Sequence, residues 1–154
     1  MVGSDDERYF NEIVESTSLN GFNGVNTSRF SDRLDNYEGE IWWLPLSRST
    51  RDRMDDGKFY DYLFNLAKER VPYDMGQAVK SALDMMDGLS KSLGVGTYNQ
   101  EDFSKMFCSE LVSSGLEVSG AVDAINCSEV TPIDLCRWNI YHPNYYQLIS
   151  PNEF

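Results

Sequence analysis

The sequence predicts an α+β domain, because its elements run in the order strands, helices, strands. The chain has 154 residues, of which 41% are hydrophobic and 13% aromatic, and this is enough apolar material for one core. No internal repeat, low-complexity tract or interdomain linker divides it. We therefore expect residues 1–154 to form a single domain.

The predicted strands lie toward the two ends of the chain. Residues 9–16 alternate with the period of two that is typical of a strand, and residues 40–46 form a mostly apolar run that predicts a largely buried strand. In the second strand, Pro45 must lie where the ladder needs no donor. Two further strands are predicted at residues 138–141 and 146–149, on either side of a turn at residues 142–144.

Between the strands, apolar stripes with helical spacing predict three helices. They cover residues 58–70, 76–93 and 103–118. Before them, residues 20–24 are predicted to be a loop and residues 28–36 a short helical turn. Ser104 is a suitable N-cap for the third helix, and this places Cys108 in its first turn.

The charge of the chain excludes some classes of partner. A net charge of −12 repels nucleic acid and anionic lipid, so we expect neither as a partner; a solvated acidic surface explains the charge more simply. No apolar run approaches the roughly 18–20 residues that span a bilayer. The acidic N-terminus lacks the apolar segment of a signal peptide. We therefore expect a cytoplasmic location, and the sequence does not predict the oligomeric state.

The three cysteines do not form a disulfide or metal framework. Their number is odd, and Cys108, Cys127 and Cys136 are irregularly spaced, which fits a reducing compartment. With no CxxC pair and a single histidine, a structural zinc site is not expected, and no cofactor is predicted.

Cys108 is the strongest candidate for chemistry because of its position. The start of a helix carries unpaired N–H groups and partial positive charge. Both lower the pKa of a thiol, and the same N–H groups can bind an oxyanion. The alternative is a buried, inert cysteine on a helix, which is the commoner case.

Five segments support the first interpretation. The motif around the cysteine is FCSELV at residues 107–112. The others are IVES at residues 13–16, the segment 39–46 that contains the predicted strand, VPYD at residues 71–74 and TPIDL at residues 131–135. In this order, from about residue 10 to the C-terminus, they resemble circularly permuted NlpC-type proteins, the YiiX-like branch of the papain-like superfamily.

The resemblance implies a papain-like fold, in which a small antiparallel sheet packs against helices. Members of this family are thiol hydrolases or acyltransferases that act on amide or ester bonds. By position, Cys108 matches the nucleophile, and Glu15 matches the group that orients the histidine base. For Glu15 the alternative is an exposed carboxylate at a strand end. The implied substrates are a peptide, a peptidoglycan fragment or an acyl compound.

The chain departs from the family pattern at the histidine. The family places it before the acidic residue, but residues 1–14 contain none. We hypothesise that the chain is an N-terminally truncated form of a longer ancestral sequence, which the codons upstream of Met1 would test. His142, the only histidine, could substitute if it reached Cys108; the alternative is a turn histidine beside Pro143.

Three hypotheses about function follow. The chain is a cysteine hydrolase that cleaves an amide, peptide or acyl bond, with Cys108, Glu15 and His142 as the candidate catalytic residues. Alternatively, it is an inactive papain-like pseudoenzyme that serves as a binding or structural module, or it is an incomplete piece of an enzyme. A histidine nitrogen within about 4 Å of the Cys108 sulfur would favour catalysis.

Overall fold

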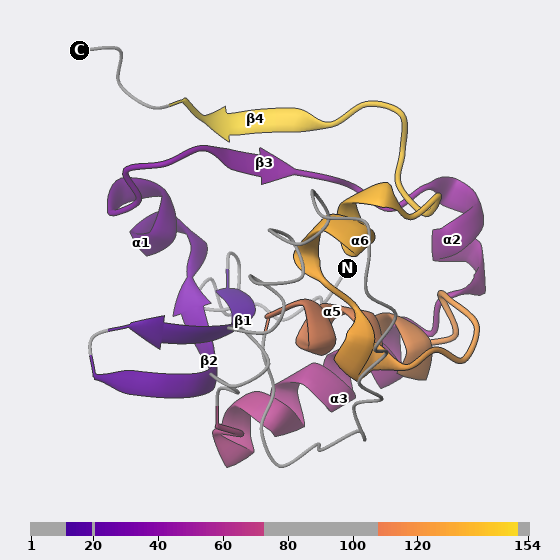
Figure 1. The fold of residues 1–154 in the computed structure, drawn as a ribbon, viewed down its shortest axis with the longest axis horizontal. Coiled ribbons are helices and arrows are strands. Elements are labelled where there is room, and N and C mark those ends of the chain that lie inside the picture. The colour runs from indigo at the N-terminus through magenta and orange to yellow at the C-terminus, as the bar shows by residue number, and fades with distance from the viewer. Residues whose placement is uncertain (1–11, 20, 73–107, 151–154) are drawn as a thin grey trace, which may run out of the picture.

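The described part of the chain forms two small antiparallel sheets packed with helices, which confirms the α+β class (Figure 1). The structure is a computed structural model that describes residues 12–19, 21–72 and 108–150. Its elements are β1 (Glu12–Leu19), β2 (Phe22–Arg29), α1 (Phe30–Asp35), β3 (Ile41–Trp43), α2 (Arg48–Arg53), α3 (Asp56–Glu69), α5 (Cys108–Val118), the 3-10 helix η2 (Cys127–Glu129), α6 (Pro132–Arg137) and β4 (Tyr146–Ile149). In these residues, no helix is both long and apolar enough to cross a membrane.

The first sheet is a hairpin of β1 and β2. The two strands pair along their whole length, from Glu12 opposite Arg29 to Leu19 opposite Phe22. Gly21 has a φ of 77°, a left-handed conformation that glycine adopts without steric cost. The prediction of a loop at residues 20–24 is therefore wrong, because residues 22–24 already belong to β2.

The hairpin is tied to the end of α3 by a close backbone contact. The N–H of Val25 donates to the carbonyl of Val71 over 2.7 Å. Gly24, with a φ of 155°, allows this approach, because a Cβ there would lie 2.5 Å from the Val71 oxygen. The side chains of Val25 and Val71 then share a buried cluster with Ala67 and Leu111.

Helix α3 confirms the helix predicted at residues 58–70. Asp55 caps its start by accepting from the N–H of Lys58 over 3.0 Å, and Arg70 ends it in the left-handed conformation. Helix α5 packs against it at Gly115, where a Cβ would lie 3.0 Å from the ring of Phe59. The prediction of a helix at residues 76–93 lies outside the described residues.

Helix α5 joins two separate core clusters. Near its start, Leu111 packs with the hairpin and α3. Near its end, Leu116 packs with Ala121 and Ile140, and Phe59 and Tyr141 lie against them. The helix predicted at residues 103–118 is confirmed over its described part, Cys108–Val118.

The second sheet is a ribbon of β3 and β4, which brings together residues far apart in the chain (Figure 1). Trp43 pairs with Tyr146 and Trp42 with Gln147. The strand predicted at residues 146–149 is confirmed, but the prediction that residues 40–46 are largely buried is wrong for Trp42 and Trp43. With two strands the ribbon leaves side chains exposed on both faces.

The segment before β4 differs from its prediction. The predicted strand at residues 138–141 is reduced to a single bridge between Tyr141 and Leu46. Helix α6 precedes it and is fixed by a capping box, in which Thr131 and Asp134 each bind the other's backbone N–H. This local capping explains why the chain turns here and does not extend into a strand.

Candidate functional site

Cys108 lies at the start of the described part of α5. The residue is exposed as a whole, but the protein around its sulfur raises the pKa of the thiol above its ordinary value through burial. The backbone N–H groups of Ser109 and of Cys108 itself act in the opposite direction, as expected of a helix start, but their effect is smaller. The expectation of a lowered pKa is therefore wrong for this structure. The predicted cap, Ser104, lies outside the described residues.

The first turn of α5 is fixed by residues just beyond the thiol. Ser109 is buried and donates to the carbonyl of Val130 over 2.5 Å, which ties α5 to the segment before α6. The side chain of Glu110 is completely buried. The backbone of Cys108 is therefore attached to a rigid part of the fold.

Glu15 lies in the middle of β1 and binds a cation. Its Oε1 accepts from Arg33 in α1, over 2.9 Å from Nε and 2.5 Å from Nη2. The hydroxyl of Ser28, across the hairpin, donates to the same oxygen. The Glu15 side chain is 21% exposed, so the carboxylate is half-buried and joins the hairpin to α1. Its partner in this structure is a guanidinium and not an imidazole.

His142 lies in the exposed turn between α6 and β4. Its N–H donates to the carbonyl of Pro45 over 2.8 Å, and its Nδ1 accepts from the N–H of Asn144 over 3.1 Å. Ile140, two residues earlier, packs on Leu116, which is about 12 Å along the axis of α5 from Cys108. The residue just before the histidine turn therefore packs on the second half of α5, and not beside Cys108.

In the described part of the chain, the three predicted catalytic residues do not form a hydrogen-bonded triad. Within the described ranges, no hydrogen bond joins any two of Cys108, Glu15 and His142. What the structure does bring together is α5 and β1, the elements that carry Cys108 and Glu15. Glu15 lies on a strand that packs against the cysteine helix, but its charge is already engaged.

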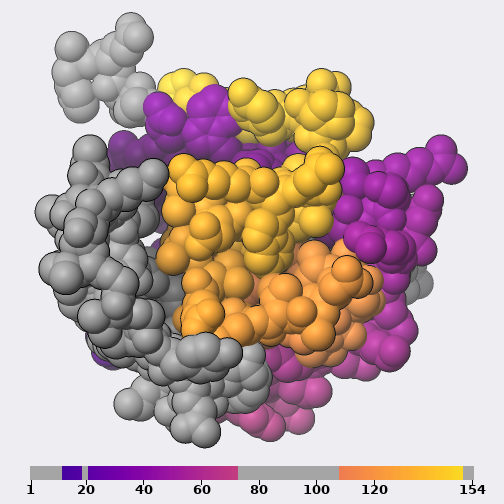
Figure 2. Space-filling view, turned by 45° about the vertical axis from the view of Figure 1, so that its right-hand side comes forward, coloured from indigo at the N-terminus to yellow at the C-terminus, as the bar shows by residue number. Residues whose placement is uncertain are grey.

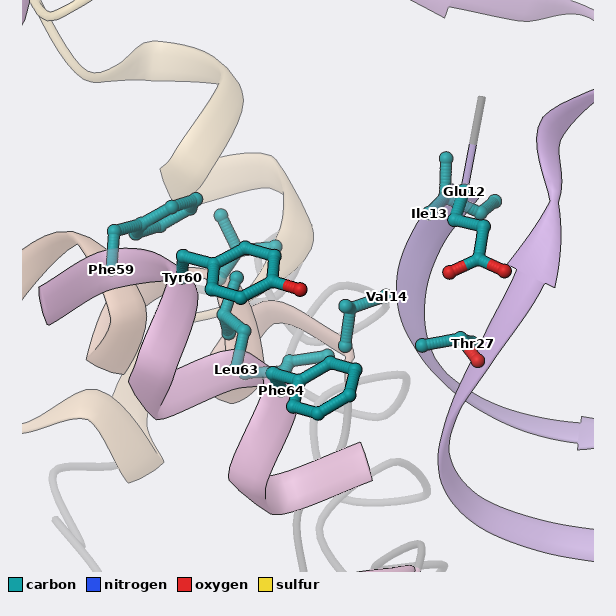
Figure 3. A pocket seen from close by; sticks show the side chains of 10 residues that line it. Glu12, Ile13, Val14, Thr27, Phe59, Tyr60, Leu63 and Phe64 are labelled. Atoms are coloured by element: carbon teal, nitrogen blue, oxygen red, sulfur yellow. The ribbon is translucent and has the colours of Figure 1, made fainter. Parts of the chain in front are cut away.

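A groove of about 650 Å³ lies between the hairpin and helices α3 and α5 (Figure 3). It is lined by Glu12, Ile13, Val14, Thr27, Phe59, Tyr60, Leu63, Phe64, Leu111 and Val112. Tyr60 and Phe64 stack along its α3 wall, with ring centroids 5.5 Å apart. Figure 3 shows Glu12 and Thr27 across from them as the polar rim. This volume falls within the range of small-molecule sites.

The groove approaches Cys108 along the surface of α5. Leu111 and Val112 follow the cysteine by three and four residues, a spacing that places side chains on the same side of a helix. The sequence does not predict this groove, although it predicts an apolar stripe on the helix at residues 58–70. Some residues of this stripe pack in the core and others line the groove. The spacing of apolar residues in the sequence does not distinguish these two positions.

A cluster of titratable groups between α3, α5 and η2 was also missed. The thiol of Cys127 donates to Oε2 of Glu117 over 3.1 Å. Burial raises the pKa of Tyr62, and a hydrogen bond with Ser114 lowers it by a smaller amount. When Cys127, Glu110 and Glu117 are ionised, their negative charges raise it further. Since these groups are spread over three elements, no motif could have shown that they meet.

Comparison with family models, with curated proteins and with solved structures finds no match to this chain. Among the residues that the structure describes, no group of three or more His, Cys, Asp or Glu side chains is placed to hold a metal ion.

Proposed function

We propose that Cys108 is the nucleophile of a thiol hydrolase that acts on an amide, peptide or acyl bond, in a domain of papain-like descent. One observation carries this proposal: an exposed cysteine in the first described turn of a largely buried helix, with the N–H groups of Cys108 and Ser109 acting on its sulfur. These N–H groups favour negative charge at this point.

The reaction that fits this position is acyl transfer to sulfur. The thiolate attacks the carbonyl carbon, a C–S bond forms, and the carbonyl electron pair moves to the oxygen beside the helix start. When the carbonyl re-forms, the bond to the amine or alcohol breaks, and that group leaves with a proton. Water then cleaves the thioester and regenerates the thiol.

The step that this arrangement lacks is removal of the thiol proton. The raised pKa keeps Cys108 protonated at neutral pH, and His142 is held in its turn by Pro45 and Asn144. We propose that the proton acceptor is supplied from outside the residues described here. Without it, deprotonation of the Cys108 thiol, and therefore its acylation, is slow at neutral pH.

The test is intact-protein mass spectrometry after incubation with p-nitrophenyl acetate. We expect one acetyl group per chain at pH 9 in the unchanged protein and in Cys136→Ala, and none in Cys108→Ala. Cys136→Ala is the matched control, because Cys136 is also an exposed thiol. Equal acetylation of the protein and of Cys108→Ala would contradict the proposal.

A second candidate is a binding module, and the groove is the observation that favours it. Its apolar walls suit an apolar segment of a ligand, whether or not Cys108 reacts. Val112 lines the groove and is 41% exposed, whereas Val118 on the same helix is 44% exposed and does not line it. Val112→Asp should abolish binding of the neutral dye Nile red, and Val118→Asp should not.

The two candidates give different results with the same protein. A Cys108 adduct that hydrolyses after imidazole is added, with no such effect in Cys108→Ala, favours the hydrolase. Retained Nile red binding in a protein whose Cys108 forms no adduct favours the binding module.

A further inference from the structure

Aromatic side chains gather on the β3–β4 ribbon and remain open to solvent. Trp42 is 43% exposed, Trp43 54%, Tyr145 63% and Tyr146 48%. In Figure 2 the yellow atoms of β4 stand at the upper edge of the molecule, next to purple atoms from the segment of β3. Large exposed aromatic groups of this kind mark interaction surfaces more often than chance.

The two faces of the ribbon carry different aromatic pairs. On one face, the ring centroids of Trp42 and Tyr145 are 5.6 Å apart and their planes are tilted by 59°. On the other, Trp43 and Tyr146 stack with centroids 5.4 Å apart. On the first face a carboxylate lies at the rings, because Nε1 of Trp42 donates to Oε2 of Glu40 over 2.9 Å.

The two segments that form the ribbon carry acidic residues and lack Lys and Arg. Glu38 and Glu40 are both exposed in the segment that leads into β3. The sequence has no Lys or Arg from residue 36 to 47 or from 138 to 154, the two segments that form the ribbon. Together with the net charge of −12, this disfavours a nucleic acid or an anionic membrane and favours a cationic partner.

We propose that the face formed by Glu40, Trp42 and Tyr145 is a docking surface for an arginine-bearing segment of a partner protein. A guanidinium is planar, so it stacks on an aromatic face and at the same time donates to a carboxylate. Two tilted rings with a carboxylate at the edge of one of them offer both interactions. This inference rests on the ribbon alone and is independent of the function proposed for Cys108.

Arginine, and not lysine, is the expected anchor. The Glu40 carboxylate lies at the edge of the Trp42 ring, which leaves the broad faces of the rings open. An ammonium group is a strongly hydrated point charge and gains less from a flat surface than a guanidinium does. Because the surface is exposed, each contact is weak, and affinity for one arginine falls in the millimolar range.

The test uses two-dimensional ¹H–¹⁵N NMR with the peptide Gly-Ser-Arg-Gly-Arg-Gly-Ser as the probe. The sequence has three tryptophans, Trp42, Trp43 and Trp138, so the indole region gives one resonance for each. We expect the peptide to shift the Trp42 indole resonance and to leave that of Trp138 in place. The same peptide with citrulline for arginine keeps the shape but removes the charge, and it should not bind.

The variants separate the two faces. Trp42→Ala and Tyr145→Ala should each weaken binding about two- to fivefold, the range of an exposed cation–π contact. Glu40→Gln should weaken it about two- to fivefold and reduce its salt dependence, since the amide oxygen still accepts from the indole. Trp43→Ala, on the other face, is the matched control and should bind normally. If Trp42→Ala does not fold, Glu40→Gln and the citrulline peptide still decide the result.

Several results would overturn the proposal. Equal loss of binding in Trp43→Ala and Trp42→Ala would show that the face is not the determinant. Equal binding of the citrulline peptide, or of a peptide with lysine for arginine, would remove the role of the guanidinium. Self-association of the chain that both Trp42→Ala and Trp43→Ala abolish would assign the ribbon to contact between copies.

Discussion

At the residue scale, two influences on the Cys108 thiol oppose each other. Burial of the sulfur raises its pKa, and the backbone N–H groups at the start of α5 lower it. Burial is the larger influence, so the folded protein holds the thiol proton more tightly than a free cysteine does. The N–H groups have a different use, since they can stabilise an oxyanion even when they do not make the thiol acidic.

The pH dependence of alkylation tests this balance. Because the pKa of Cys108 is raised above the ordinary value of 9.0, the iodoacetamide reaction should keep accelerating above pH 9. Peptide mapping by mass spectrometry would follow Cys108 separately from Cys127 and Cys136. A rate that levels off below pH 8 would show a lowered pKa and a cation or base at the sulfur.

Glu15 gives a second prediction at this scale. Glu15→Gln removes the charge that binds Arg33 and should lower the free energy of unfolding by about 1 kcal/mol or less, as for a partly exposed ion pair. Acetylation of Cys108 should not change, because no hydrogen bond within the described residues joins the two side chains. Urea unfolding and the acetylation rate check the two parts. A tenfold slower acetylation at unchanged stability would place Glu15 in the reaction.

At the scale of elements, local sequence signals explain α3 and α6 well. Helix α3 has a capping aspartate and a regular apolar stripe, and both are visible in the sequence. The capping box of α6 follows the threonine–proline pattern at residues 131–132, but the aromatic residues after it favour a strand, and the helix was missed. The Asn-Gly pair at residues 20–21 is a common hairpin signal that would have predicted β2.

Gly24 provides the prediction for the hairpin. Gly24→Ala should destabilise the protein by about 1–3 kcal/mol, because the new Cβ would lie 2.5 Å from the carbonyl oxygen of Val71. Gly21→Ala is the control, since its left-handed φ causes strain but no atom lies within 4 Å of the new Cβ. Thermal unfolding should show a larger loss for Gly24→Ala. Equal melting temperatures for Gly24→Ala and the unchanged protein would contradict the tight contact.

At the scale of the whole molecule, some features of α5 can be predicted from the sequence and others cannot. Its amphipathic pattern shows that one side is buried, and the α+β class follows from the order of the elements. The pattern does not show that Leu111 and Leu116 belong to different clusters, or that the groove opens beside Val112. These features depend on contacts between residues far apart in the chain.

The candidate site illustrates the same limit. Cys108 could be singled out from its position at a helix start, which is a local property. Whether Glu15 and His142 reach it is a property of the whole fold, and here Glu15 binds Arg33 while His142 is held by Pro45. The exposure of the ribbon could not be predicted either. An apolar run predicts a buried strand, and only the fold shows that this sheet has two strands and leaves their side chains exposed.

The most direct test of the role of Cys108 compares two reactions at two thiols. Alkylation by iodoacetamide forms no oxyanion, whereas acetylation by p-nitrophenyl acetate does. Peptide mapping would give the ratio of rates at Cys108 and Cys136, both exposed, for each reagent. If the N–H groups at the start of α5 stabilise the oxyanion, the acetylation ratio should exceed the alkylation ratio by about tenfold or more. Equal ratios for the two reagents would contradict the assignment of Cys108 as an acyl-accepting nucleophile.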